Sequence, residues 1–270
     1  KVLAITIDDA FESVYTVAWP MLRQAGLPFT LFVATEAIDK NYAGYMRWDQ
    51  IIELAEAGVT IGSQAVTHPH LTRLSTDSVA RELRDSRTRL EMKINRPVTL
   101  LAYPYGEASL SVMNEATLAG YNFAFGQHSG ALGDKSDRWY LPRFAMNMRY
   151  GTLERFRERI AMKSLPVTKI TPSDPLIDRQ SMPTHITLEL DASRSAPSLG
   201  QIQCYHSPST LMEQVDRPIA DGQGTTGDRS GTVLVFQLPR PLDPGRNRIN
   251  CTARDADGSW RWFGWQFIVQ

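Results

Sequence analysis

The sequence predicts an α/β fold: a (β/α) barrel, closed or nearly closed, followed by a small all-β sandwich. From residue 1 to about 165, strand-like apolar runs alternate with helix-like segments, and this alternation is typical of parallel strands with crossover helices. About six such units favour a barrel over an open sheet. Further on, prolines cluster and helical periodicity gives way to short alternating runs, which favour a sandwich. We therefore expect the barrel over residues 1–172 and the sandwich over residues 173–270.

The barrel strands are expected where short apolar runs are bounded by polar or turn residues. In chain order they are Val2–Ile7, Phe29–Ala34, Val59–Ile61, Thr99–Ala102, Phe123–Phe125 and Tyr140–Arg143. We expect the first of them to be buried. Ligands of such folds bind at the carboxyl ends of the strands, so the residues that follow each strand are the ones to search for chemistry.

Helices are expected between these strands. They are Val14–Ala25, Trp48–Ala57, a helix capped by Ser75 that runs to about Lys93, Leu110–Ala119 and Leu153–Met162. Glycine follows the first, second and fourth directly, which is the usual C-terminal stop. In the long helix, the charged residues between Arg81 and Lys93 are interpreted as a solvated face.

The second domain is predicted from five short alternating runs. They are Ile186–Leu190, Gln201–Tyr205, Val233–Leu238, Arg248–Ala253 and Trp260–Val269. Both cysteines of the chain, Cys204 and Cys251, fall in this region. We expect a disulfide between them, and with it an oxidising compartment; two buried free thiols are the alternative.

Composition narrows the class of function. The chain has 270 residues, and its lysines and arginines balance its aspartates and glutamates at a formal net charge of zero. Such a balance gives no reason to expect a nucleic acid or an anionic membrane as partner. No apolar run is long enough to span a bilayer. No export signal is visible, and we expect that the chain has been trimmed, because it opens inside a predicted strand.

Two adjacent carboxylates, Asp8 and Asp9, end the first predicted strand. Adjacent carboxylates are costly to keep ionised unless a cation neutralises one of them. A bound metal ion would do so, and the second carboxylate could then act as a base.

Two further clusters follow predicted strands. The segment 62–70 contains His68 and His70, and the segment 103–106 reads Tyr-Pro-Tyr-Gly. Imidazole and carboxylate ligands with an open position suit Zn²⁺ or a similar ion. Because all three clusters follow strands, we expect them at the same end of the barrel.

Together these clusters resemble the polysaccharide deacetylase (NodB-homology) family, carbohydrate esterase family four. The family's first motif, T-F-D-D-G, reads T-I-D-D-A at residues 6–10. Its second motif, H-[ST]-x-x-H, falls within I-G-S-Q-A-V-T-H-P at 61–69, and the P-Y-G of its third stands at 104–106. The resemblance covers about residues 1–165 and implies a deformed (β/α) barrel. The helix after the first motif is more similar to that of exopolysaccharide deacetylases of the PgaB/IcaB kind than to that of chitin or peptidoglycan deacetylases.

The resemblance implies a role for each matching residue. Asp8 would be the general base, Asp9 and His68 would be metal ligands, and Tyr105 would donate its backbone N–H to the oxyanion. The implied cofactor is a divalent metal, most simply Zn²⁺, with Co²⁺ or Ni²⁺ as alternatives. The implied reaction removes N-acetyl groups from an N-acetylglucosamine-type polysaccharide.

Two departures from the family pattern concern the metal and the base. Gln64 stands where the family has its first metal-binding histidine. Gln64 could ligate through its amide oxygen, His70 could complete the site, or only two protein ligands could remain. The family often has an arginine shortly before the third motif that orients the catalytic aspartate; none is found here, and Arg143 is similar to the arginine that replaces it in some members.

The family's late catalytic histidine, in an L-x-H motif, has no counterpart between residues 137 and 172. We expect His128, which follows a predicted strand, to be the general acid; a solvent-facing loop histidine is the alternative. Trp260, Trp262 and Trp265 could stack on sugar rings, but packing in the sandwich core or against the barrel is the favoured interpretation.

The sequence therefore predicts a metal-dependent polysaccharide de-N-acetylase that acts on an N-acetylated amino-sugar polymer. The expected disulfide and the resemblance place it in the periplasm, outside the cell or at the cell surface. A carbohydrate-binding protein on a catalytically weakened deacetylase scaffold is the alternative, because of Gln64. No oligomeric state is predicted.

Overall fold

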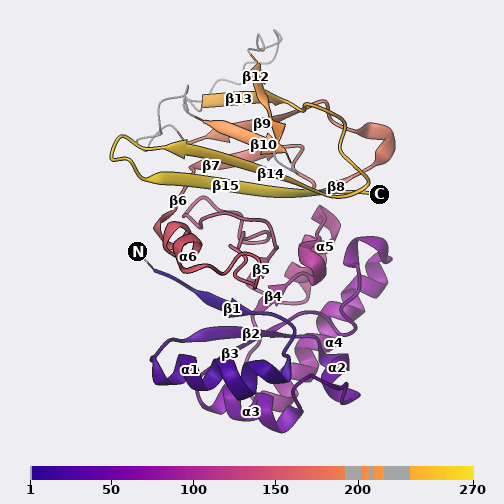
Figure 1. Cartoon of the computed structure of the whole chain (residues 1–270). Coiled ribbons are helices and arrows are strands. Elements are labelled where there is room, and N and C mark those ends of the chain that lie inside the picture. The colour runs from indigo at the N-terminus through magenta and orange to yellow at the C-terminus, as the bar shows by residue number, and fades with distance from the viewer. Residues whose placement is uncertain (1, 192–201, 207–209, 216–231) are drawn as a thin grey trace. The chain divides into compact units, whose positions relative to one another are not determined.

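The computed structural model describes residues 2–191, 202–206, 210–215 and 232–270. The chain forms two compact units (Figure 1). The first consists of Lys1–Gly126 with Arg138–Tyr140, and the second of Gln127–Asp137 with Leu141–Gln270.

The first unit is built on a parallel sheet whose strands follow one another in chain order. They are β1 (Ile5–Ile7), β2 (Phe29–Val33), β3 (Thr60–Ser63), β4 (Leu100–Ala102) and β5 (Phe123–Phe125). Every pairing is parallel, as the alternation of strands and helices predicts. The predicted deformed (β/α) fold is thus confirmed, with β1 and β5 as the outer strands of the sheet.

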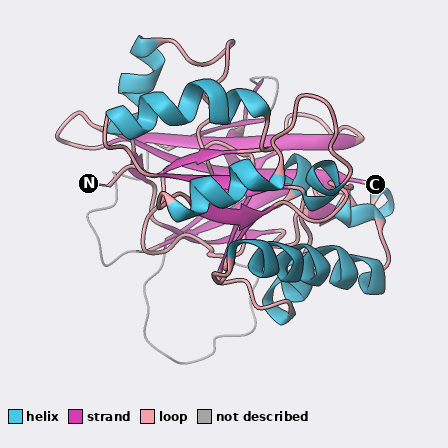
Figure 2. Ribbon diagram, turned by 90° about the horizontal axis from the view of Figure 1, so that it is seen from below, coloured by secondary structure: helices cyan, strands magenta, loops and turns pink. Residues whose placement is uncertain are grey.

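Helices connect these strands, and Figure 2 separates the two kinds of element by colour. They are the π-helical turn η1 (Val14–Ala18), α1 (Trp19–Gln24), α2 (Thr35–Asp39), α3 (Trp48–Glu56), the 3₁₀ turn η2 (Leu71–Arg73), α4 (Thr76–Ile94), the 3₁₀ turn η3 (Pro104–Gly106) and α5 (Leu110–Leu118). The predicted helix over 14–25 is divided at Trp19. Pro20 has no N–H for the carbonyl of Thr16, which explains the wider turn before it.

Two predicted strands differ from the structure. Within the described range 2–191 no strand forms at 140–143; Tyr140 is instead buried in the first unit, with its hydroxyl bonded to the carbonyl of Gly106. The first strand is also shorter than predicted and begins at Ile5. Val2 is 96% exposed, and Ile5–Ile7 are only half-buried, so the expectation of a buried first strand was wrong.

Close packing beneath the site depends on one glycine in β3. A Cβ on Gly62 would lie 2.5 Å from the ring of Phe32 and 3.1 Å from the carbonyl oxygen of Leu100. No side chain fits between these neighbours, so glycine lets β3 lie between β2 and β4 with the ring of Phe32 against it.

The second unit contains two sheets, as the predicted sandwich requires. One has the order β11–β10–β14–β15–β6, with β8 also pairing with β15, and the other has the order β12–β13–β9–β7. The bounds are β6 Lys163–Ser164, β7 Val167–Thr171, β8 Leu176–Ile177, β9 His185–Leu190, β10 Gln203–His206, β11 Thr210–Leu211, β12 Glu213–Val215, β13 Thr232–Gln237, β14 Gly245–Arg254 and β15 Trp260–Val269. Two short helical elements, α6 (Leu153–Ala161) and η4 (Arg179–Ser181), complete the unit.

The second unit begins earlier in the chain than the boundary predicted near Pro172. The strands β6 and β7 precede that proline, yet β6 pairs with β15 and β7 pairs with β9. The pairing is antiparallel except where β6 and β8 join β15 in parallel. Of the strand predicted over 201–205, Gln201 lies outside the described residues.

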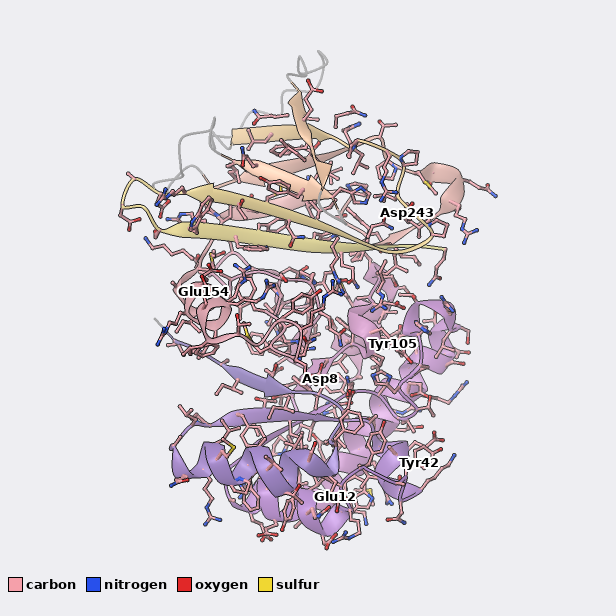
Figure 3. All side chains as sticks on the ribbon, viewed as in Figure 1. Asp8, Glu12, Tyr42, Tyr105, Glu154 and Asp243 are labelled. Carbon is pink, nitrogen blue, oxygen red and sulfur yellow. A yellow bond between two sulfur atoms is a disulfide. The ribbon has the colours of Figure 1, made fainter. Side chains whose placement is uncertain are left out.

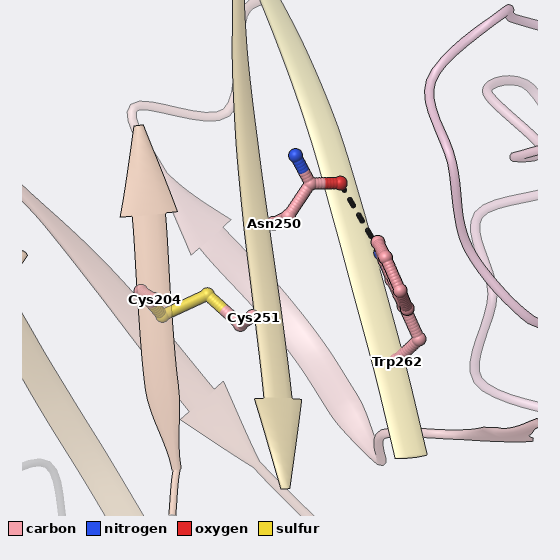
Figure 4. The surroundings of a disulfide bond; sticks show 4 residues. All are labelled: Cys204, Asn250, Cys251 and Trp262. Carbon is pink, nitrogen blue, oxygen red and sulfur yellow. Dashed lines mark hydrogen bonds between the residues drawn. A yellow bond between two sulfur atoms is a disulfide. The ribbon is translucent and has the colours of Figure 1, made fainter. Parts of the chain in front are cut away.

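The predicted disulfide between Cys204 and Cys251 is confirmed (Figure 4). The two cysteines stand directly opposite each other on β10 and β14, with their Cα atoms 4.0 Å apart. Both side chains are buried in the sandwich. The crosslink therefore joins neighbouring strands whose cysteines are 47 residues apart in the sequence.

Candidate active site

The three sequence clusters meet at the carboxyl edge of the parallel sheet. Asp8 and Asp9 follow β1, residues 64–70 follow β3, and the turn η3 follows β4. Asp8 and Tyr105, from the first and third clusters, are labelled in Figure 3. Asp9 contacts residues of the second cluster, and Tyr105 contacts both of its histidines. We expected these segments to lie together because each of them follows a strand, and the parallel pairing of the strands places them at the same edge.

The backbone of this site is strained. Among the described residues, seven other than glycine have a positive φ, and two of them are asparagines, which adopt this conformation readily. The other five all lie in the three clusters, at Asp9 (73°), Ala10 (53°), Ala65 (66°), His68 (56°) and Tyr105 (60°). The cost is on the order of 1–2 kcal/mol for Ala and Tyr and smaller for Asp and His, and the conformation persists when its surroundings enforce it. Such strain concentrates at functional sites, which independently marks this edge of the sheet.

The side chains of Asp9 and His68 lie close enough to bind one metal ion together. The Nε2 atom of His68 lies 3.7 Å from Oδ1 of Asp9, and both side chains are partly exposed, at 27% and 37%. Two donor atoms bound to one tetrahedral Zn²⁺ stand about 3.4 Å apart. The pair therefore fits a divalent ion with a small adjustment of either side chain.

Gln64 does not offer its oxygen freely to such an ion. Its side chain is fully buried, and its Oε1 accepts a hydrogen bond from the backbone N–H of Asp9 at 3.2 Å. Its Nε2 atom is buried without a hydrogen-bond partner among the described residues. The amide nitrogen cannot ligate a metal. In this arrangement Gln64 fixes the backbone of the carboxylate pair.

His70 has a partner other than Asp9. Its Nδ1 lies 2.7 Å from Oε2 of Glu107, whose side chain is almost fully buried. Its ring stacks on that of Tyr105, with centroids 4.1 Å apart and planes inclined by 13°. Within the described part of the chain, no group of three or more His, Cys, Asp or Glu side chains is arranged to hold a metal.

Tyr105 is in contact with two histidine rings. The ring of His68 packs edge-on against the Tyr105 ring, with centroids 4.7 Å apart, whereas the ring of His70 is stacked on it. Gly106, the next residue, donates its N–H to Tyr103 and accepts a buried hydrogen bond of 2.9 Å from Tyr140. These contacts enforce the left-handed backbone at Tyr105 and so fix the direction of its N–H.

Glu82 supports the second cluster from α4. Its carboxylate accepts hydrogen bonds from the N–H groups of Val66 and Thr67, both at 2.9 Å, and from the hydroxyl of Thr67 at 2.8 Å. The interpretation of this helix face as merely solvated was therefore wrong for Glu82. Glu82 is distant in sequence from the site, and no local pattern marks it. Glu107, by contrast, directly follows Pro-Tyr-Gly and could have been found there.

The other predicted catalytic residues, His128 and Arg143, belong to the second unit. The backbone N–H of Arg143 donates to the carbonyl of His128 at 2.9 Å, and the buried His128 ring lies 6.2 Å from that of Trp265. The predicted roles of His128 and Arg143 stay predictions.

The tryptophans of β15 are mostly engaged within the second unit. Trp265 is buried, and Trp262 donates its indole N–H to Asn250 while the Arg159 guanidinium lies 4.6 Å from its ring centre. Trp260 is exposed. Packing therefore accounts for Trp262 and Trp265, as the favoured interpretation of the sequence has it.

The fold is a (β/α) domain whose sheet brings a carboxylate and a histidine, Asp9 and His68, together at its carboxyl edge. Residues 1–124 match the family model described as polysaccharide deacetylase. This region, which makes up nearly all of the first unit, is thus similar to the polysaccharide deacetylase family.

Individual proteins are similar to this chain over about half of its length. The chain is 26% identical over 131 residues to YxkH of Bacillus subtilis, covering 48% of this chain and 46% of that protein. It is 24% identical over 155 residues to the poly-beta-1,6-N-acetyl-D-glucosamine N-deacetylase of Staphylococcus aureus, covering 53% of each. The chain thus spans about half the length of these curated relatives.

Solved structures share the fold. The Streptococcus pyogenes deacetylase PplD, in complex with acetate, has a TM-score of 0.56 at 24% identity, over 59% of this chain and 70% of that one. IcaB from Ammonifex degensii has a TM-score of 0.51 at 21% identity, over 55% and 69%.

Proposed function

We propose that this protein is a metal-dependent hydrolase that removes N-acetyl groups from an N-acetylglucosamine-type polysaccharide. The observation that carries the proposal is the meeting of Asp8–Asp9, His68 and Tyr105 from three strand ends of a polysaccharide deacetylase domain. Their strained backbones support it, because strain of this kind is retained where it serves a site.

Each residue has a task in this reaction. Asp8 accepts the proton of the attacking water. Asp9 and His68 would hold a divalent ion, most simply Zn²⁺, with Co²⁺ or Ni²⁺ as alternatives. The chemistry that such an ion supplies is Lewis-acid polarisation of the acetyl carbonyl and of the attacking water. The backbone N–H of Tyr105 donates to the oxygen on which negative charge develops.

Acetate release tests this function. The substrate is a partly acetylated glucosamine oligomer, with and without a chelator, and the variant is Asp8→Asn. We expect release by the metal-loaded protein and a loss of about 10²- to 10⁴-fold in kcat for the variant, which is the usual contribution of a general base. An active protein that neither chelator nor added metal affects would contradict the metal mechanism. Full activity of Asp8→Asn would contradict the assignment of the base.

An exported amino-sugar polymer is the proposed substrate class. The named activity of the Staphylococcus aureus relative supports a poly-N-acetylglucosamine. The disulfide supports an oxidising location, in the periplasm, outside the cell or at its surface. Among the described residues, no helix has both the length and the apolar composition needed to cross a membrane.

Gln64 favours a second candidate, a carbohydrate-binding protein on a catalytically weakened deacetylase scaffold. Its oxygen is bonded to the Asp9 backbone, and its nitrogen cannot bind a metal. The Gln64→His variant separates the two candidates. If the site is weakened, the wild-type protein binds oligomer without turnover, and the variant gains metal affinity. If the site is active as it stands, wild-type turnover is already present and responds to metal.

A further inference from the structure

Three aromatic side chains are in contact at the surface of the first unit. One of them, Phe11, follows the carboxylate pair in the sequence by two residues. The ring of Phe11 lies 4.9 Å from that of Tyr45, and the ring of Tyr45 lies 6.5 Å from that of Tyr42, measured between centroids. We call these three residues the aromatic cluster. Asp8 and Tyr42 are both labelled in Figure 3.

The backbone fixes the position of the cluster relative to the site. Phe11 and Tyr45 form an isolated antiparallel bridge. Met46 donates its N–H to the carbonyl of Ala10 at 2.9 Å, and Glu12 donates to Gly44 at 2.8 Å. Phe11 is three residues from Asp8, so their Cα atoms are within about 11 Å of each other even for an extended chain. The strained backbone at Asp9 and Ala10 determines where the Phe11 ring is placed.

Packing of the unit does not account for these rings. Phe11 is 42% exposed and Tyr42 is 45% exposed, whereas the neighbouring Met46 is buried and supplies the apolar anchor of this segment. Contiguous exposed aromatic surface next to a reactive site is typical of a binding surface.

The charges around the cluster indicate what it binds. Asp8, Asp9 and Glu12 make this edge acidic. The nearby cations Lys40 and Arg47 are already paired, with Glu36 at 2.7 Å and with Asp49 at 3.2 Å. An anionic partner such as a phosphate or nucleic acid is therefore disfavoured.

A neutral pyranose ring fits this surface. Its C–H face matches the negative faces of aromatic rings, and its hydroxyls match the hydroxyls of the tyrosines. We propose that Phe11, Tyr42 and Tyr45 form a subsite that stacks a sugar ring of the substrate polymer, next to the ring whose acetyl group lies at Asp8. This inference rests on the proposed function and adds the residues that hold a neighbouring sugar of the polymer, so that affinity depends on the length of the oligomer.

Binding without turnover tests the subsite. In an Asp8→Asn background, isothermal titration calorimetry measures the Kd of a β-1,6-linked N-acetylglucosamine pentamer. We expect the double substitution Phe11→Ala and Tyr42→Ala to raise this Kd about tenfold, equivalent to about 1.4 kcal/mol. Phe11→Leu with Tyr42→Leu, which keeps apolar bulk and removes the rings, should have a similar effect. It also guards against a folding defect in the alanine variant.

Phe123→Ala is the matched control. Phe123 is 44% exposed in the same unit and begins β5, so it stands at the amino end of a strand, whereas the site follows the carboxyl ends. We expect it to leave the Kd unchanged. An unchanged Kd in both double variants, or an equal loss in the control, would overturn the subsite and leave acetate release by the unaltered protein as it is. Absence of both pentamer binding and acetate release would overturn the proposed function together with the subsite.

Discussion

Substitution of Glu82 by alanine removes the support beneath His68. Three hydrogen bonds are lost, one from the part-buried N–H of Val66 and two from the exposed Thr67. A bond to a charged group contributes about 1.5 kcal/mol when part-buried, and about 0.5 kcal/mol where water can replace it. The sum predicts a loss of about 2.5 kcal/mol in the free energy of unfolding.

The same change should reach the site, because the segment that Glu82 holds leads directly into His68, whose φ is 56°. With the support gone the backbone can relax and the imidazole moves. Displacements of about 1 Å in catalytic groups cost up to about 100-fold. We therefore expect kcat for acetate release to fall between about 10-fold and 100-fold.

Urea unfolding and acetate release measure the two effects. Asp85→Asn is the control, because it removes a carboxylate of the same helix that pairs, among the described residues, with the exposed Arg84. This variant should stay within about 0.5 kcal/mol of the wild type. Glu82→Gln keeps an acceptor oxygen and should fall between the two. If Glu82→Ala unfolds and turns over like Asp85→Asn, the claim that Glu82 positions His68 is wrong.

Three further outcomes follow from the contacts described above. Tyr140→Phe removes a buried hydrogen bond beside the oxyanion donor, so unfolding free energy should fall by about 1–2 kcal/mol and kcat should fall more than KM changes, by steady-state kinetics; equal stability would count against that bond. Replacing Cys204 and Cys251 by serine should cost up to about 4 kcal/mol, the entropy of a loop of this length, seen as a lower Tm of the second unit; an unchanged Tm would contradict it. Arg261 holds the pKa of Asp255 below its usual range, so the pair stabilises the fold above the unfolded-state pKa of about 3.9. That stabilisation is lost as the pH falls through the lowered pKa, and Asp255→Asn should weaken the pH dependence of Tm there; an unaltered acid limb would speak against the pair.

Much of the fold could be predicted because its determinants are local. Helix ends were marked by glycines, and parallel strands followed from alternation. The strand predicted at 140–143 was wrong because apolar residues are also buried outside strands, as Tyr140 is here. The hydroxyl of Tyr140 donates to the carbonyl of Gly106, which is 34 residues away in the sequence. The early start of the second unit was missed because β6 is only two residues long and pairs with a strand near the end of the chain.

The site was predictable as far as its residues follow strands. The segments that follow the strands contain Asp8, Asp9, His68 and Tyr105. Because the carboxyl ends of parallel strands lie at one edge of a sheet, their proximity could be predicted. The supporting contacts were not predictable in the same way. Glu82 and Tyr140 act from distant positions, and nothing in the pattern of α4 distinguishes Glu82 from the solvated charges around it. The hydrogen bond that the Gln64 oxygen accepts comes from the backbone N–H of Asp9, whose position only the three-dimensional structure defines.

Zinc titration of the chelator-treated protein, followed by calorimetry and by acetate release in the same samples, examines the pairing of Asp9 and His68 as metal ligands. The expected result is that metal binding and activity return together in the wild type and in His70→Ala, and that Asp9→Ala and His68→Ala lose both. Retention of metal-dependent activity in Asp9→Ala and His68→Ala, or full activity of the metal-free wild type, would contradict the account.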